Sequence, residues 1–318
     1  MRPIHLLALA ALSLIWGASF MFIKVMLDEL TPIAIAWARL AGGGLLIGAV
    51  VASLRRGLPR SRVYWRDVAV VGLFGSAIPM VLIPWGEREI PSNLAAVLNG
   101  AMPFGVAILS TIFLPAERLT KGKAVGVTIG FVGLAVIIGP DALDLRSGST
   151  QGQLAVVAAA MSYAAGAVFT RRRLLGVDTT TLAGAQNTMA LLMLTPLLFL
   201  AGDPPNPLHL EGRTVAAALG LALLSQGVAV ILYFWLLSNV EATQASFVTY
   251  LAPIAAQFWG WLVLNEVPAL ALAPGLSLII LGIVVVNRSA RAPVQVSAPQ
   301  PASASAADPA AEGEAAAS

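Results

Sequence analysis

Long apolar stretches, separated by short polar ones, follow one another along nearly the whole chain. Each covers about 20 residues, which is the length of helix that crosses the hydrocarbon core of a bilayer. The pattern predicts ten membrane-spanning helices, at residues 4–24, 32–53, 67–86, 92–114, 121–139, 152–170, 180–201, 214–237, 243–264 and 269–287. After Asn287 the chain turns to Ala, Pro and Ser with few large apolar residues, so 289–318 is predicted to be a disordered tail.

The distribution of Lys and Arg among the polar connections predicts the orientation in the membrane. If the N-terminus is cytoplasmic, the inner segments hold 14 of these residues and the outer segments four. Basic residues concentrate on the cytoplasmic side of membrane proteins. Both termini are therefore predicted to be cytoplasmic, with the lipid bilayer as the main surroundings of the chain.

Composition agrees with a membrane protein and removes several classes of function. Hydrophobic residues make up 58% of the chain and charged ones 11%, against about 25% charged in soluble domains. The net charge of +3 is divided among short clusters between apolar runs, so no nucleic-acid partner is expected. With no cysteine, and with His5 and His209 far apart, neither a disulfide nor a metal site is predicted, and no cofactor motif is present.

The second half of the chain repeats the first. Trp16 is matched by Tyr163 at an offset of 147, Pro103 by Pro253 at 150, and Gly126 by Gly275 at 149. A nearly constant offset over more than 100 residues indicates a duplication with small changes in loop length. Each copy holds five predicted spans, an odd number, so the second copy enters the membrane with inverted topology. Inverted repeats are typical of secondary transporters, whose substrate site lies near the midplane at the repeat interface.

Several segments resemble a known family of carriers. They are "LIWGASFMFIK", "AWARLAGGGLL" and "LPAERLTKGKAVGVTIGFVGLAVI" in the first copy, and "VLNEVPALALAPGLSLIILGIVVV" in the second. Over residues 8–138 and 152–287 the chain resembles the EamA family of the drug/metabolite transporter superfamily. The resemblance implies an all-α bacterial inner-membrane carrier of ten helices in two inverted five-helix repeats, 1–140 and 151–288. Members often export amino acids or other small metabolites. Two positions depart from the pattern, because Tyr163 replaces the commoner Trp and Gln186 stands where the first copy has Arg39.

Pro103 and Pro253 lie in the middle of two predicted spans, where proline removes a backbone donor and bends the helix. We interpret them as hinges that free the carbonyls of Asn99 and Thr249. In a membrane such carbonyls occur where protein or a water-filled cavity meets them. Asn99 and Thr249 are therefore candidates to face each other across a central cavity and bind substrate, and helix packing is the alternative.

Other candidate substrate-binding residues combine aromatic surface with polar groups, a mixture that suits a small amphipathic solute. They are Trp16, Ser19, Ser76, Tyr163, Gln226, Tyr233 and Tyr250. Helix packing is the alternative for the aromatic residues, and contact between helices is the alternative for the serines. Arg39 is the only fully charged side chain well inside a span. It either binds a substrate carboxylate or, as we favour, has a structural role and reaches toward the membrane surface.

Acidic residues are expected at the ends of spans only. No Asp or Glu lies in the core of a predicted span, so no carboxylate proton relay is expected, and Glu117 and Glu266 are expected to cap the helices that follow them. No phosphate-binding loop is present, so ATP is not expected to drive transport directly.

The leading prediction is a carrier of a small-molecule substrate. A membrane sensor or partner subunit with the carrier fold is an alternative. An integral-membrane transferase fits less well, because it requires clustered acids or a histidine base.

Overall fold

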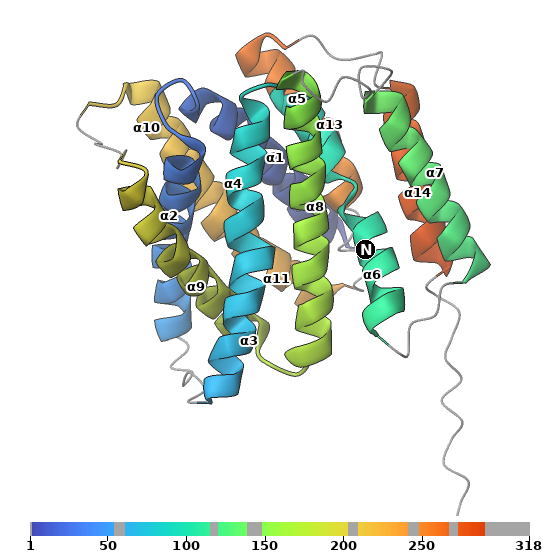
Figure 1. Cartoon of the computed structure of the whole chain (residues 1–318), viewed down its shortest axis with the longest axis horizontal. Helices are drawn as coiled ribbons and strands as arrows, with labels where there is room; N and C mark the ends of the chain where they lie inside the picture. Colours follow the sequence, from blue (N-terminus) through green and yellow to red (C-terminus); the bar gives the residue numbers. More distant parts are fainter. Residues whose placement is uncertain are drawn as a thin grey trace, which may run out of the picture.

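The computed structural model describes residues 2–53, 61–114, 120–138, 148–202, 209–240, 248–266 and 273–289. All regular structure in these ranges is helical (Figure 1). The elements are α1 (Pro3–Met26), α2 (Pro32–Ser53), α3 (Arg62–Gly72), the π-helical η1 (Leu73–Ala77), α4 (Ile78–Glu87), α5 (Ser92–Asn99), α6 (Met102–Phe113), α7 (Lys121–Ile138), α8 (Gly148–Arg173), α9 (Thr179–Leu200), α10 (Gly212–Leu219), the π-helical η3 (Gly220–Val228), α11 (Ala229–Asn239), α13 (Val248–Leu264) and α14 (Ala273–Ser289). Glu117 and the tail after Ser289 lie outside the described residues.

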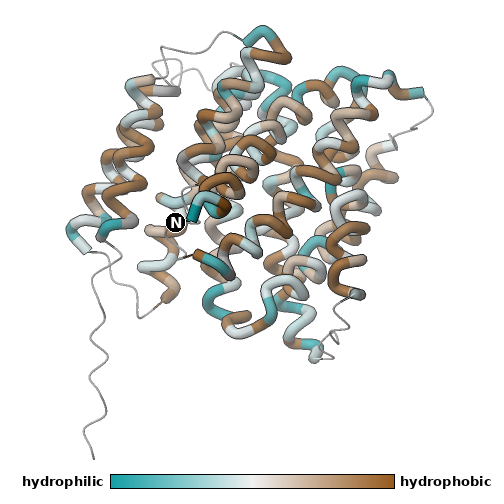
Figure 2. Tube along the Cα trace, turned by 180° about the vertical axis from the view of Figure 1, so that it is seen from behind, coloured by the Kyte–Doolittle hydropathy of each residue, from teal (hydrophilic) through white to brown (hydrophobic). Residues whose placement is uncertain are grey.

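Seven helical stretches are long and apolar enough to cross a membrane. They begin at Pro3, Pro32, Arg62, Ser92, Gly148, Thr179 and Gly212. Apolar residues dominate along the helices and polar ones gather toward their ends (Figure 2). Described helices also occupy the three other predicted windows as α7, α13 and α14, although these do not meet the same measure of length and hydropathy.

Two spans contain a wider π-helical turn at equivalent places in the two copies. η1 lies between α3 and α4, and η3 lies between α10 and α11, about 150 residues further along. A π-helical turn shifts the hydrogen-bond ladder and often marks a functional position in a helix. These segments carry Ser76 and Gln226, which are matched at an offset of 150.

The span at 92–114 is interrupted, which changes the interpretation of its proline. α5 ends at Asn99, and α6 begins at Met102 after Gly100 and Ala101. Pro103 therefore lies in the first turn of α6, where the missing N–H costs little. Its counterpart Pro253 lies inside α13, so only the second proline sits within a continuous helix.

Small residues join the two copies in matched pairs. α7 and α14 lie side by side at one edge of the bundle (Figure 1). A Cβ on Gly126 would lie 2.7 Å from the carbonyl oxygen of Gly282, and one on Gly133 would lie 2.7 Å from that of Gly275. The offset of 149 converts one contact into the other, because Gly126 matches Gly275 and Gly133 matches Gly282. This exchange is what an approximate two-fold relation between the copies requires.

Polar contacts join the two copies at one end of the bundle. We call it the α1–α2 end, because it holds the turn between those helices. Glu266 accepts hydrogen bonds from the backbone N–H of Ser92 (2.8 Å) and of Asn93 (3.1 Å), so it caps α5. Glu266 thus caps a helix start, but that helix is α5 of the other copy and not, as had been expected, the helix that follows Glu266. Arg213 pairs with Asp28 at 3.2 Å at the same end.

Candidate functional site

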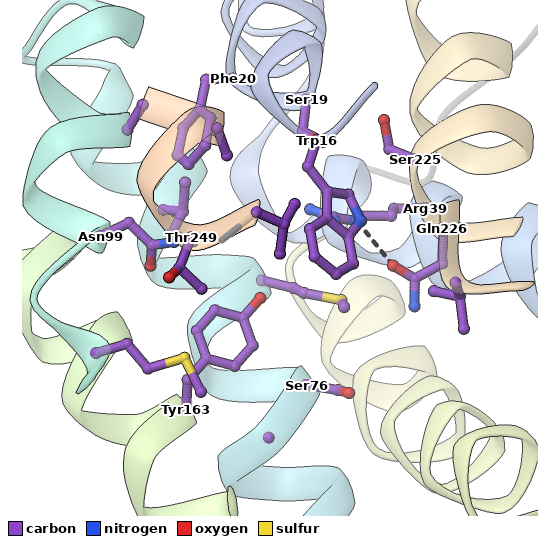
Figure 3. Close-up of a pocket in the computed structure, with 18 of the residues that line it drawn as sticks. Trp16, Ser19, Phe20, Arg39, Ser76, Asn99, Tyr163, Ser225, Gln226 and Thr249 are labelled. Atoms are coloured by element: carbon purple, nitrogen blue, oxygen red, sulfur yellow. Dashed lines mark hydrogen bonds between the residues drawn. The ribbon is translucent and has the colours of Figure 1, made fainter. Parts of the chain in front are cut away.

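A cavity of about 360 Å³ lies between the two copies and is lined from both of them. Most of the side chains singled out from the sequence surround it (Figure 3). They are Trp16, Ser19, Arg39, Ser76, Asn99, Pro103, Tyr163, Gln226, Thr249 and Pro253. A pocket of this size accommodates a small organic molecule.

Arg39 supplies the positive charge of this cavity. Its Nε donates to Oε1 of Gln226 at 3.1 Å, as the dashed line in Figure 3 marks. Nε2 of Gln226 donates in turn to Oδ1 of Asn187 at 3.2 Å, and Nδ2 of Asn187 donates to the carbonyl of Leu40 at 2.8 Å. The chain of bonds orients the guanidinium. In the part of the protein that the structure describes, its two Nη groups have no hydrogen-bond partner, which leaves them for an anion.

The second copy makes a matching but uncharged contact. Gln186, the counterpart of Arg39, donates from Nε2 to Oγ of Ser76 at 2.9 Å and to the carbonyl of Gly75 at 3.0 Å. Ser76 is the counterpart of Gln226, so the same two positions meet in both halves. The cavity is therefore built symmetrically but charged asymmetrically. Sequence reasoning noted Gln186 only as a departure and did not single out Asn187.

Trp16 and Tyr163 supply aromatic surface from equivalent places on α1 and α8. Both line the cavity, and Tyr163 is partly buried among the helices. Tyr233 is absent from the described lining, and its ring packs 5.2 Å from that of Trp16, centroid to centroid. Tyr233 thus packs against Trp16 without lining the cavity itself. Tyr250 belongs to α13, but its side chain lies outside the described residues.

Asn99 and Thr249 point into the same part of the cavity (Figure 3). The side-chain oxygen Oδ1 of Asn99 is buried without a hydrogen-bond partner among the described residues. Ser19 Oγ, on the neighbouring α1, is also buried and unpartnered in the described part of the chain. Buried polar atoms are normally paired, and those that are not often await a water or a ligand.

Comparison with known proteins identifies the family. The sequence profile of the EamA-like transporter family matches residues 3–139 and again residues 150–288. This chain belongs to the EamA-like transporter family. The two EamA repeats predicted from the sequence are thereby confirmed. With its seven apolar helices it is a multi-pass membrane protein.

Relatives of this EamA protein are transporters from several organisms. Transporter YoaV of Bacillus subtilis is 26% identical over 87% of this chain and 94% of its own. The inner membrane transporter YedA of Escherichia coli is 27% identical over 80% of each chain. The "Probable terminal-alkyne amino-acid exporter" of Streptantibioticus cattleyicolor is 27% identical over 86% of this chain and 90% of its own. A solved crystal structure with 22% identity and a TM-score of 0.63 covers 92% of this chain, which shows a shared fold.

One buried acid in this EamA protein was missed by the sequence reasoning. Glu87 is the last residue of α4 and is 0% exposed. The predicted span ended at residue 86, which placed Glu87 in a connecting loop. Glu87 lies at the end of a span, as expected of an acid in this chain, but its burial was not predicted. The intervals of one turn between Met80, Ile83 and Glu87 indicated a shared helix face, and that signal was available in the sequence.

Proposed function

We propose that this chain is a secondary transporter that exports a small organic solute bearing a carboxylate, such as an amino acid. The observation that carries the proposal is the guanidinium of Arg39, which lines the cavity between the copies and has no hydrogen-bond partner for either Nη group among the described residues. A guanidinium binds a carboxylate through two parallel N–H donors, and this geometry makes it selective for planar anions. The relative named as a probable amino-acid exporter supports the class of solute and the direction.

The polar and aromatic groups around Arg39 suit the rest of such a solute. Asn99 Oδ1 and Ser19 Oγ are buried acceptors without described partners, and an ammonium group is a matching donor. Trp16 and Tyr163 present aromatic faces on either side of the repeat interface. A zwitterion with an apolar side chain would use all three kinds of surface.

Alternating access would arise from two inverted five-helix repeats that rock about the cavity. The ten predicted spans and the bias of basic residues support cytoplasmic termini in a bacterial cell, with the α1–α2 end outside. In that orientation the contacts of Glu266 and Arg213 join the two copies at the outer end, as in a carrier closed to the outside.

Efflux from proteoliposomes tests this function directly. Purified protein is reconstituted, the vesicles are loaded with the proteinogenic amino acids and with the amines that lack their carboxyl groups, and the solutes that leave are identified by mass spectrometry. We expect selective efflux of one or a few amino acids that requires the protein. If only non-carboxylate solutes leave, the solute class is wrong. If no solute leaves, the carrier function itself fails, and a sensor or partner subunit becomes the better interpretation.

Matched variants connect that flux to the cavity. Tyr163→Ala removes an aromatic ring that lines the cavity, and Phe199→Ala removes one that is 65% exposed on the surface of α9. We expect flux to fall in the first variant and to remain in the second. Equal effects of the two truncations would place the transport path elsewhere.

A further inference from the structure

Glu87 is a buried acid that takes part in none of the side-chain contacts described so far. Its oxygens Oε1 and Oε2 are both buried and have no hydrogen-bond partner in the described chain. Met80 and Ile83 precede it by seven and four residues and line the cavity, so Glu87 continues their face of α4. The carboxyl group thus lies about one helical turn beyond the cavity, toward the α1–α2 end.

Charged groups reach Glu87 from three directions. They are Lys24 on α1, Arg39 on α2 and Glu266 after α13. α8 packs against α4 through uncharged residues, since Gly152 and Val156 face Gly86. Among the described residues, none of these charges forms an ion pair or hydrogen bond with the carboxyl group.

Lys24 is close to Glu87 but bonds to its backbone. The Nζ of Lys24 donates to the carbonyl of Glu87 and, at 3.0 Å, to the carbonyl of Ile90. The carbonyl of Glu87 is the last of α4, and that of Ile90 lies in the turn that follows it. Carbonyls at a helix end lack partners within the helix and attract a cation. The ammonium group thereby fixes the helix end and leaves the neighbouring carboxyl group unpaired.

An unpaired carboxyl group without water is tolerated in its neutral form. Burying an isolated carboxylate is so costly that proteins usually protonate the group instead. A neutral acid fits the closed α1–α2 end, whereas an ionised one fits an open end that admits water. Closure of this end therefore favours proton binding to Glu87. By thermodynamic linkage, proton binding to Glu87 favours closure to the same extent.

We propose that Glu87 is a proton-binding site through which this carrier exchanges an inward-moving proton for an outward-moving solute. A hydronium ion at the open α1–α2 end gives a proton to one carboxylate oxygen. One O–H bond of the hydronium ion breaks, one forms on the carboxyl group, and a water molecule is left. The end then closes over the neutral acid. The O–H bond breaks when the proton passes to water in the cavity one turn away. No oxidation, reduction or other covalent change accompanies this cycle.

The sequence repeats support a coupling site in one half of the protein only. The counterpart of Glu87 at an offset of 150 is Leu237, and the counterpart of Arg39 is Gln186. Both charged positions are thus confined to the first copy and act on one side of the cavity. A single acid is sufficient if its access alternates between the two sides of the membrane.

Infrared difference spectroscopy tests the proton site without any solute. Protein in lipid is titrated from acidic to alkaline pH, and the C=O absorption of protonated carboxyl groups is followed. We expect the wild type to lose such a band, Glu87→Gln to lack this change, and Glu89→Gln to keep it, since Glu89 is exposed two residues away. Glu87→Asp should keep a shifted band. Identical spectra for the wild type and Glu87→Gln would overturn the proposal.

Flux measurements test the coupling, which rests on the transport function proposed above. Proteoliposomes with an acidic interior should accumulate the amino acid that exchanges fastest, by up to about tenfold per pH unit for one proton per solute. Glu87→Gln should exchange labelled for unlabelled solute but lose accumulation, while Glu87→Asp and Glu89→Gln should retain both. Wild-type accumulation that ignores pH, or persists in Glu87→Gln, would overturn the coupling and leave the carrier function standing. If a variant loses exchange as well, its thermal unfolding shows whether it is folded, and the infrared result then decides the proposal.

Discussion

Replacing Arg39 by glutamine gives the first copy the side chain that its counterpart Gln186 already provides. The structure shows what this removes, because Nε donates to Gln226 at 3.1 Å while neither Nη group has a hydrogen-bond partner in the described ranges of the chain. A hydrogen bond to a charged group contributes about 1.5–3 kcal/mol. At 1.4 kcal/mol per factor of ten, Arg39→Gln should weaken the binding of a carboxylate solute by about 10- to 140-fold.

The assay compares solutes that differ only in the carboxylate. The apparent affinity for an amino acid and for the amine that lacks its carboxyl group is measured by competition against exchange in proteoliposomes. We expect Arg39→Gln to lower the affinity for the amino acid and to leave that for the amine nearly unchanged. Arg66→Gln is the matched control, because Arg66 lies at the edge of α3 with its side chain 65% exposed.

Two results would refute this reasoning. If Arg39→Gln binds the amino acid as tightly as the wild type, Arg39 has the structural role that the sequence favoured. If the variant loses the amino acid and the amine equally, the guanidinium organises the cavity through Gln226 and contacts no carboxylate. Arg39→Lys separates charge from shape, since lysine keeps the charge but lacks the planar pair of donors.

Three further predictions concern the fold and its orientation. Gly126→Ala should lower stability by about 1–3 kcal/mol because its Cβ would meet the backbone of α14, whereas Gly48→Ala should not, since nothing lies within 4 Å there; thermal unfolding in detergent measures both. Reporter fusions after Lys121 should read cytoplasm and those after Glu89 the outside, and a reversed reading at either site contradicts the inverted topology. Deletion after Arg291 should leave exchange in proteoliposomes unchanged, because the removed sequence has few apolar residues to dock; lost exchange would give the tail a function.

Sequence reasoning reached the family, the helical windows and ten of the residues that line the cavity because these depend on repeated patterns. A long apolar window predicts a spanning helix whatever surrounds it. The offset of 147 between Trp16 and Tyr163 likewise predicts, from the sequence alone, that the two aromatic residues occupy equivalent positions. The π-helical turns at Ser76 and Gln226 did not follow from pattern. A wider turn depends on which neighbouring groups donate hydrogen bonds to the displaced carbonyls, as Gln186 does to the carbonyl of Gly75, and this partner comes from the other repeat.

Glu87 shows where a one-dimensional pattern fails for a physical reason. A charged residue at the edge of an apolar window is assigned to water, because exposure is the common fate of a carboxylate. Here Lys24 of α1 donates to the carbonyls of Glu87 and Ile90 at the end of α4, and Glu87 is 0% exposed. The contact that accompanies this burial joins Lys24 to a residue 63 positions away, so no local pattern could reveal it. The same contact predicts a role for Lys24 in proton coupling. If its ammonium group left these carbonyls, water would reach the carboxyl group, and Lys24→Met should therefore weaken proton coupling before it weakens exchange.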